Sequence, residues 1–179
     1  GFLALAALNG FGRSNALRLL SLQVTLALCL LRLQVFRLAS QLGRNGLRLF
    51  AQRAVLDSPR DLRELTLPLC GTPESFSHAN TARGLELVAT ADAILLSTPI
   101  YNYDANAVAK NFIELTGKGW ENKVVGFLCA AGGEKSFMSV LPLANSLMLD
   151  FRCVIVPRFV YATGSAFAPD ATIVDPAIA

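Results

Sequence analysis

Residues 92–115 read DAILLSTPIYNYDANAVAKNFIEL and contain the patterns of a strand, a turn and a helix in succession. The run at 93–97 (AILLS) is apolar, has the length of a strand and ends at Thr98 and Pro99. Such a run is typical of a strand that is buried on both faces of a parallel sheet. Apolar residues at 108, 109, 112, 113 and 115 then follow with helical spacing. A buried strand followed by a turn and a helix indicates an α/β fold.

The same alternation extends in both directions from this stretch. Residues 2–8 (FLALAAL) form a candidate first strand, and residues 123–130 (KVVGFLCA) form another, which ends before two glycines. Residues 136–149 have a helical pattern, and residues 153–161 form a last strand that continues past Pro157. Strands that alternate with helices predict a parallel sheet covered by helices, within a single domain over residues 1–179.

The segment that follows the first candidate strand and the first loop is harder to interpret. Residues 16–56 are rich in leucine and arginine, and they end with the next candidate strand, at residues 47–56. A strand–helix–strand unit takes about 30 residues, whereas nearly twice that length separates Phe2 from the next candidate strand. Three interpretations of this segment stay open: one long helix that ends near Leu42, a native insertion, or an error of translation or assembly. The register of residues 16–56 is therefore not assigned. We expect residues 19–42 to be helical.

Composition excludes several classes of protein. The chain has 179 residues, of which 53% are apolar and 16% are charged, and these values are typical of a densely packed domain. Its four cysteines lie far apart without a CxxC pair, and it has one histidine, so no metal-ligand spacing is present. We interpret the cysteines as reduced thiols of a cytoplasmic protein.

The net charge of +3 is unevenly distributed along the chain. Residues 1–60 hold eight arginines and one acidic residue, whereas the rest of the chain is net acidic. A basic arm for nucleic acid is one interpretation. However, these arginines are diluted among leucines, and no aromatic platform accompanies them. We therefore expect no nucleic-acid partner.

The strongest candidate for a membrane span is the apolar segment at residues 19–31 (LLSLQVTLALCLL). It has thirteen residues between Arg18 and Arg32, whereas a span needs about 20. A signal peptide also fits poorly, because no positive region precedes the segment and no clear cleavage site follows it. We expect a buried helix here and no membrane association.

Three loops follow candidate strands and are expected to carry the chemistry. They are the first loop (residues 9–15), the second loop (residues 98–106) and the third loop (residues 131–136). In open parallel sheets, ligands bind beyond the carboxyl ends of the strands, where the strand order reverses. The three loops are therefore predicted to converge on one ligand.

The first loop has the features of a phosphate site. It reads NGFGRSN and opens a helical pattern, so its backbone amides offer unpaired donors at a positive helix end. Glycines permit close approach, arginine adds charge, and serine and asparagine add polar groups. The candidate residues are Asn9, Gly12, Arg13, Ser14 and Asn15. The alternative is an ordinary loop in which Ser14 is the N-cap of a helix.

The second loop is more informative, because it combines a proline with two tyrosines and two asparagines at the end of a buried strand. A stiff turn, aromatic faces and amide groups are what a flat heteroaromatic ring requires of its site. The candidate residues are Thr98, Pro99, Ile100, Tyr101, Asn102 and Tyr103. The alternative is a surface turn that carries tyrosines and leads to an N-cap at Asn106.

Two motifs also carry a resemblance to a known family. TPIYN followed by KNFIEL resembles the hallmark of the NADPH-dependent FMN reductases. KVVGFLCAAGGEKSFMSV resembles that family's fourth strand, its glycine-bearing flavin loop and the next helix, and LTLPLC at residues 65–70 resembles the segment after its second strand. The resemblance covers roughly residues 61–167. It implies that Ala131, Gly132, Gly133 and Ser136 of the third loop also contact the flavin.

The resemblance implies both a fold and an activity. The fold is a flavodoxin-like three-layer sandwich with a five-stranded parallel sheet of order 2-1-3-4-5, in which a final helix is truncated at the end of this chain. The activity is that of an NAD(P)H-dependent FMN reductase, with FMN and NADPH as cofactors and a flavin, quinone or similar small molecule as acceptor. A homodimer or homotetramer is implied as well. No side-chain acid or base is required.

The chain departs from the family in the first loop. The family has a serine-rich phosphate loop, of which only Ser14 remains here. Two rival hypotheses therefore stay open: a flavodoxin-like electron carrier that is not an enzyme, and a degenerate relative that no longer binds flavin. Carriers tend to be strongly acidic, whereas this chain is net basic.

Overall fold

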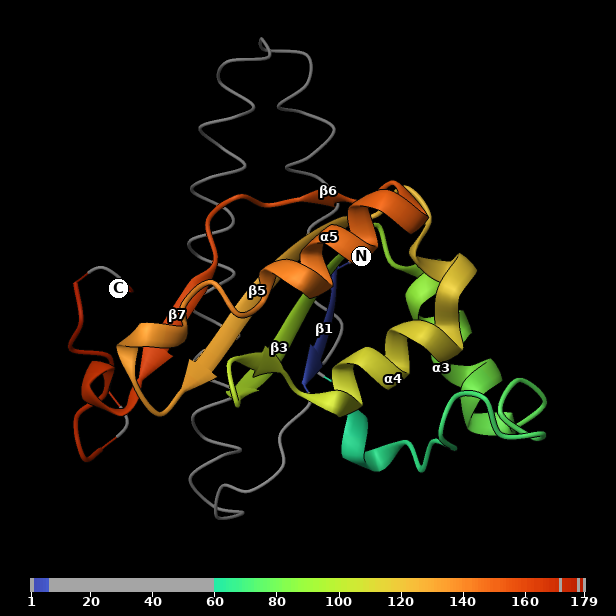
Figure 1. Ribbon diagram of the computed structural model, residues 1–179, viewed down its shortest axis with the longest axis horizontal. Coiled ribbons are helices and arrows are strands. Elements are labelled where there is room, and N and C mark those ends of the chain that lie inside the picture. The colour runs from blue at the N-terminus through green and yellow to red at the C-terminus, as the bar shows by residue number, and fades with distance from the viewer. Residues whose placement is uncertain (1, 7–59, 171, 177, 179) are drawn as a thin grey trace, which may run out of the picture.

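The computed structural model of the chain describes residues 2–6, 60–170, 172–176 and 178 (Figure 1). Several predictions lie outside these residues and stay predictions: the helix at 19–42, the strand at 47–56 and the first loop. Within the described ranges, no helix combines the length and the hydropathy that crossing a membrane requires.

A central sheet organises the described part of the chain. Its strands are β1 (Phe2–Ala6), β2 (Arg60–Asp61), β3 (Ala93–Tyr101), β4 (Asp104–Ala105), β5 (Val124–Ala131), β6 (Val154–Ile155) and β7 (Val160–Thr163). The main path through the sheet is β2-β1-β3-β5-β6, and every pair along it is parallel. Strands β1, β3 and β5 lie side by side and point in the same direction in Figure 1.

The sheet differs from the predicted five-stranded parallel sheet, because the described residues contribute seven strands to it and one pair is antiparallel. Strand β4 folds back on the end of β3, so that Ile100 pairs with Ala105. The predicted last strand is divided into β6 and β7, which both pair with β5. Pro157 lies in the interruption, where it offers no N–H to a neighbouring strand.

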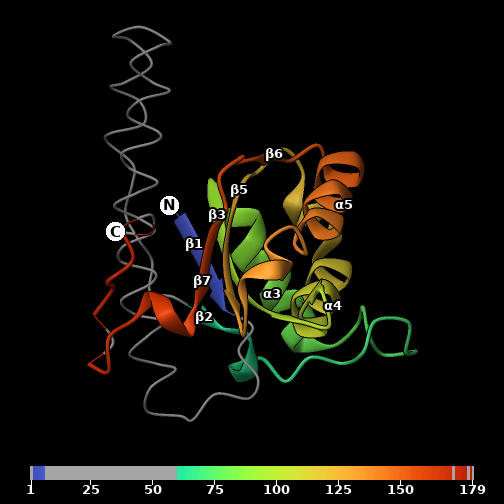
Figure 2. The ribbon, with the colours of Figure 1, turned by 60° about the vertical axis from the view of Figure 1, so that its left-hand side comes forward.

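Three α-helices lie on one face of the sheet, which Figure 2 shows edge-on. They are α3 (Ala79–Thr90), α4 (Ala107–Thr116) and α5 (Leu141–Phe151). Because only this helical layer is described, the three-layer arrangement stays a prediction. Helix α4 agrees with the helical pattern in the sequence. The pattern at 136–149, in contrast, divides into a short 3-10 helix η3 (Glu134–Ser136), a turn, and α5, which has a proline in its first turn.

The core lies between the sheet and these helices. Strand β3 is buried at every position except its last, as its apolar run indicates. Trp120 and Phe112 are fully buried and meet edge to face, and the Trp120 indole donates a hydrogen bond to the Thr116 hydroxyl at 2.8 Å. Helices α3 and α4 approach closely at Gly84, where a Cβ would lie 2.8 Å from the Phe112 ring. This packing fixes α4, which follows the second loop directly.

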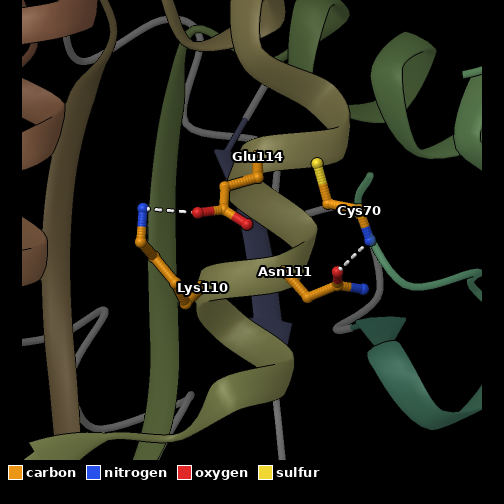
Figure 3. Close-up of polar contacts among 4 residues, drawn as sticks. All are labelled: Cys70, Lys110, Asn111 and Glu114. Carbon is orange, nitrogen blue, oxygen red and sulfur yellow. Dashed lines mark hydrogen bonds and ion pairs between the residues drawn. The ribbon is translucent and has the colours of Figure 1, made fainter. Parts of the chain in front are cut away.

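The segment before α3 is tied to α4 by one side chain. The Asn111 amide oxygen accepts the Cys70 N–H at 2.8 Å, and its NH₂ group donates to the Pro68 carbonyl at 3.0 Å. One turn of the same helix carries an exposed ion pair, in which Lys110 and Glu114 are 2.9 Å apart. Figure 3 shows the hydrogen bond between Cys70 and Asn111 and the ion pair between Lys110 and Glu114. Asn111 therefore fastens residues 68–70 to the helix, whereas the ion pair faces solvent.

Candidate functional site

The second and third loops lie next to each other because β3 and β5 are parallel neighbours that end at the same edge of the sheet. Thr98 pairs with Cys129 and Pro99 with Ala130 in the register of these strands. Strand β3 then ends at Tyr101 and β5 at Ala131. The strand geometry alone therefore places the two loops side by side.

The second loop is a tight hairpin between β3 and β4. Tyr101 pairs with Asp104, so the connection consists of Asn102 and Tyr103 alone. Both have positive φ angles, 51° and 61° respectively. A two-residue hairpin turn with positive φ at both positions has the features of a type I′ turn, in which asparagine is common at the first position and glycine at the second. A tyrosine at the second position is uncommon and holds a large side chain at the edge of the loop.

A buried contact closes the base of this hairpin. The Thr98 side chain is fully buried, and its hydroxyl oxygen accepts the Asn106 N–H at 3.2 Å. The Asn106 side chain in turn accepts the Val108 N–H at 2.7 Å and so caps α4. The hairpin is thus joined to a buried strand at one end and to a capped helix at the other.

The third loop is supported by a residue from another strand. Its two glycines, Gly132 and Gly133, are exposed, and the 3-10 helix η3 follows them. The Tyr161 hydroxyl, from β7, donates a hydrogen bond to the Gly133 carbonyl and lies 2.7 Å from the Ser136 hydroxyl. Strand β7 therefore supports this loop at two points, Gly133 and Ser136.

A pocket of about 620 Å³ opens between the two loops. Its walls combine an apolar side chain, a tyrosine ring, an amide, a hydroxyl and one charge of each sign. The lining residues are Ile100, Asn102, Tyr103, Gly133, Glu134, Lys135 and Ser136. Such a mixture suits a flat ligand that has both an apolar face and polar edges.

The predicted site residues fall into three groups. Five of them line the pocket together: Ile100, Asn102, Tyr103, Gly133 and Ser136. Five others stand beside it without lining it: Thr98 and Pro99, which are buried in β3, Tyr101, Ala131 and Gly132. The remaining five, Asn9, Gly12, Arg13, Ser14 and Asn15, lie outside the described residues.

Three residues near the pocket were not predicted. Glu134 and Lys135 line it directly, and their position between the glycines and Ser136 was the available signal. Tyr161 supports the pocket from behind the third loop. No local pattern identifies Tyr161, because its partners lie more than twenty residues away in the sequence.

One buried cysteine, Cys129, lies in β5 beside Thr98 of the second loop. Burial raises the pKa of the Cys129 thiol from 9.0 to about 12, so this residue is a neutral, apolar part of β5. Within residues 2–6 and 60–178, as far as the structure describes them, no three histidine, cysteine or acidic side chains are grouped to hold a metal ion.

Comparison with known proteins decides the family. The model of the NADPH-dependent FMN reductase family matches residues 39–168 of this sequence. The chain belongs to this family. The resemblance of TPIYN and the glycine loop to the FMN reductases is thereby confirmed, and the match includes the second and third loops that form the pocket.

One curated relative of this FMN reductase family member is an NAD(P)H-dependent FAD/FMN reductase from Geobacillus thermodenitrificans. The two are 27% identical over 120 residues, which make up 66% of this chain and 65% of the relative. The matched region thus spans a little less than two thirds of the relative's length.

Solved structures show the fold of this FMN reductase family member. FerB, a flavoenzyme NAD(P)H:(acceptor) oxidoreductase from Paracoccus denitrificans, has a TM-score of 0.65 at 17% identity, with 97% of this chain and 86% of FerB covered. General stress protein 14 from Treponema denticola, solved in complex with FMN, has a TM-score of 0.55 at 14% identity, and the match covers 92% of this chain and 86% of that protein. The chain therefore has a flavodoxin-like α/β fold.

Proposed function

We propose that the chain is an FMN-binding, NAD(P)H-dependent oxidoreductase that takes hydride onto FMN and passes electrons to a flavin, a quinone or a similar small acceptor. Membership of the FMN reductase family supports this proposal. The observation that carries it is that Asn102, Tyr103 and Ser136 all line one pocket.

The residues of the pocket fit the ring of a flavin. A volume of about 620 Å³ lies within the usual range of small-molecule sites, which is about 300–1,000 Å³. Ile100 and the Tyr103 ring offer apolar surface to a ring face, and Asn102 offers both a donor and an acceptor to a ring edge. We assign the ring-binding role to these residues and to the third loop.

The chain's own contribution to the reaction is position and access. When bound, FMN supplies the redox chemistry, and the protein orients it. The Tyr103 side chain is 67% exposed and Tyr101 is 42% exposed, so the pocket lies at the surface, where a nicotinamide can reach it. No described side chain needs to transfer a proton in this scheme.

The phosphate of FMN is proposed to bind at the first loop, through Asn9, Gly12, Arg13, Ser14 and Asn15. Supporting this assignment, Ala6 at the end of β1 pairs with Ser97 in β3, one residue before Thr98. The chain therefore leaves β1 at the sheet edge that carries the pocket.

We further propose a cytoplasmic homodimer or homotetramer with no nucleic-acid partner. Exposed apolar side chains on and beside α5 support association between copies of the chain: Phe137, Met138, Leu141, Met148 and Leu149. Sedimentation of the purified protein measures the number of copies.

Steady-state kinetics with the purified protein tests the proposed activity. The protein is saturated with FMN, and NADPH oxidation is followed with a quinone as acceptor. We expect acceptor-dependent oxidation, and we expect Asn102→Ala to weaken FMN binding severalfold through loss of an edge hydrogen bond. Bound FMN without NADPH oxidation would indicate an electron carrier instead. A colourless protein that binds no FMN would indicate a degenerate relative.

A further inference from the structure

The Tyr161 side chain of strand β7 contacts the third loop through its hydroxyl group. Its ring is half-buried and packs against the main hydrophobic core, and its backbone is paired with Cys129 of β5. The hydroxyl contacts the Gly133 carbonyl and the Ser136 hydroxyl, and both of these residues line the pocket. A single phenolic oxygen thus holds two points of the third loop.

The number of protons available sets the direction of these hydrogen bonds. The Gly133 carbonyl can only accept, so the one Tyr161 proton is donated to it. The Tyr161 oxygen can then only accept from Ser136, whose oxygen lies 2.7 Å away. The Ser136 hydroxyl therefore uses its own proton within the protein, and its oxygen keeps only lone pairs for another partner.

We propose that Tyr161 is a positioning residue that holds the third loop against the pocket and orients the Ser136 hydroxyl so that it presents a hydrogen-bond acceptor to the ligand. Ser136 then accepts a hydrogen bond from a donor on the ligand, and we assign this donor to the N3–H group of the oxidised flavin ring. The choice of flavin as the ligand rests on the proposed function, but the positioning role does not.

The positioning role is tested on the protein without ligand. Tyr161→Phe keeps the ring and its packing and removes only the hydroxyl. We expect amide hydrogen exchange of residues 133–136 to become at least threefold faster, with the melting temperature nearly unchanged. Ser165→Ala is the matched control, because it removes another hydroxyl pair, Thr163 with Ser165, at the same distance of 2.7 Å and outside the pocket lining. Equal exchange in Tyr161→Phe and the wild type would overturn the positioning role.

The acceptor role is tested by titration with riboflavin and with 3-methylriboflavin, which lacks the N3 proton. We expect the wild type to bind riboflavin about threefold to tenfold more tightly, the effect of one hydrogen bond. Ser136→Ala should lose this preference for riboflavin over 3-methylriboflavin. Tyr161→Phe should reduce the ratio of the two affinities, because the Ser136 proton no longer bonds to Tyr161 and can point to the ligand. The double variant Tyr161→Phe with Ser136→Ala should equal Ser136→Ala alone.

The outcomes separate this inference from the proposed function. FMN is titrated alongside the two riboflavins. A wild type that binds FMN but neither riboflavin would overturn the acceptor role alone, whereas a wild type that binds none of the three would overturn the proposed function as well, and hydrogen exchange would still decide the positioning role. A wild type that binds riboflavin, combined with an equal loss for both flavins in Ser136→Ala, would overturn the acceptor role while the proposed function stands.

Discussion

The hydroxyl of Thr98 and the backbone N–H of Asn106 are joined by a buried hydrogen bond of 3.2 Å that closes the base of the second loop. Between them the chain leaves β3, turns at two residues with positive φ and returns as β4. The contact explains how an exposed turn keeps a defined shape: its first residue is fixed in the sheet, and its last residue is fixed at the start of α4.

Replacing Thr98 with valine should loosen the hairpin. The substitution keeps the shape of the side chain but leaves the buried Asn106 N–H without its acceptor, which costs about 1–3 kcal/mol. Urea unfolding measures the loss, and hydrogen exchange at the Asn106 amide should become faster. Thr98→Ser retains the hydroxyl and should keep that amide protected. Unchanged exchange in the valine variant would show that the bond does not hold the hairpin.

Replacing Tyr103 with glycine should stabilise the protein. A positive φ costs a non-glycine residue such as Tyr103 about 1–2 kcal/mol of folding stability, and glycine removes this cost. The extra conformational freedom of glycine in the unfolded chain takes back about 0.5–1 kcal/mol of that gain. We therefore expect a net gain of roughly 0.5–1 kcal/mol in urea unfolding, since the exposed Tyr103 side chain loses little packing. Flavin affinity should fall at the same time, because the ring wall is removed. A loss of stability would contradict this interpretation of the turn.

Asn111 and Lys110 provide a matched pair on one helix. Asn111→Ala removes both hydrogen bonds to residues 68–70 and should cost about 1–3 kcal/mol. Lys110→Ala removes only an exposed pair with Glu114 and should cost at most about 0.5 kcal/mol. Both free energies of unfolding come from denaturant titration. Equal costs would mean that the Asn111 contacts add nothing to the attachment of this segment.

Cys129 should make the protein sensitive to alkaline pH. Because burial raises the pKa of its thiol from 9.0 in the unfolded chain to about 12 in the folded chain, the unfolded state loses the proton first as pH rises. The stabilising contribution is fully present below pH 9.0 and is lost between there and about pH 12. Between about pH 8 and about pH 10.5, the free energy of unfolding of the wild type should fall by about 2 kcal/mol more than that of Cys129→Ala, as measured by urea unfolding at each pH. If the free energy of unfolding fell equally with pH in the two proteins, the raised pKa of Cys129 would be contradicted.

The local patterns of the sequence predicted much of the fold around the second loop. The apolar run at 93–97 is part of the buried strand β3, and the amphipathic run after Asn106 is helix α4 with Asn106 as its N-cap. These features depend on neighbouring residues, so periodicity and capping chemistry identify them. The pairing of β3 with β5 also follows from the alternation of strands and helices.

Features that depend on distant or strained contacts could not be predicted. Strand β4 consists of two residues and exists because the turn at Asn102 and Tyr103 folds the chain back. Asparagine is common at the first position of such a turn, but tyrosine is uncommon at the second, so the sequence indicated a turn here without identifying a two-residue hairpin. Tyr161 supports the third loop from another strand, and only the packed sheet brings the two together.

The central claim is that the pocket between the second and third loops binds the flavin ring, and amide chemical shifts test it most directly. Isotope-labelled protein is titrated with FMN and the backbone spectrum is followed. We expect the largest shifts at residues 100–103 and 132–136, with smaller changes on the far strand β2. The Asn102→Ala variant should need severalfold more FMN to reach the same shifts. Saturable shifts that leave both loops unchanged would contradict the claim.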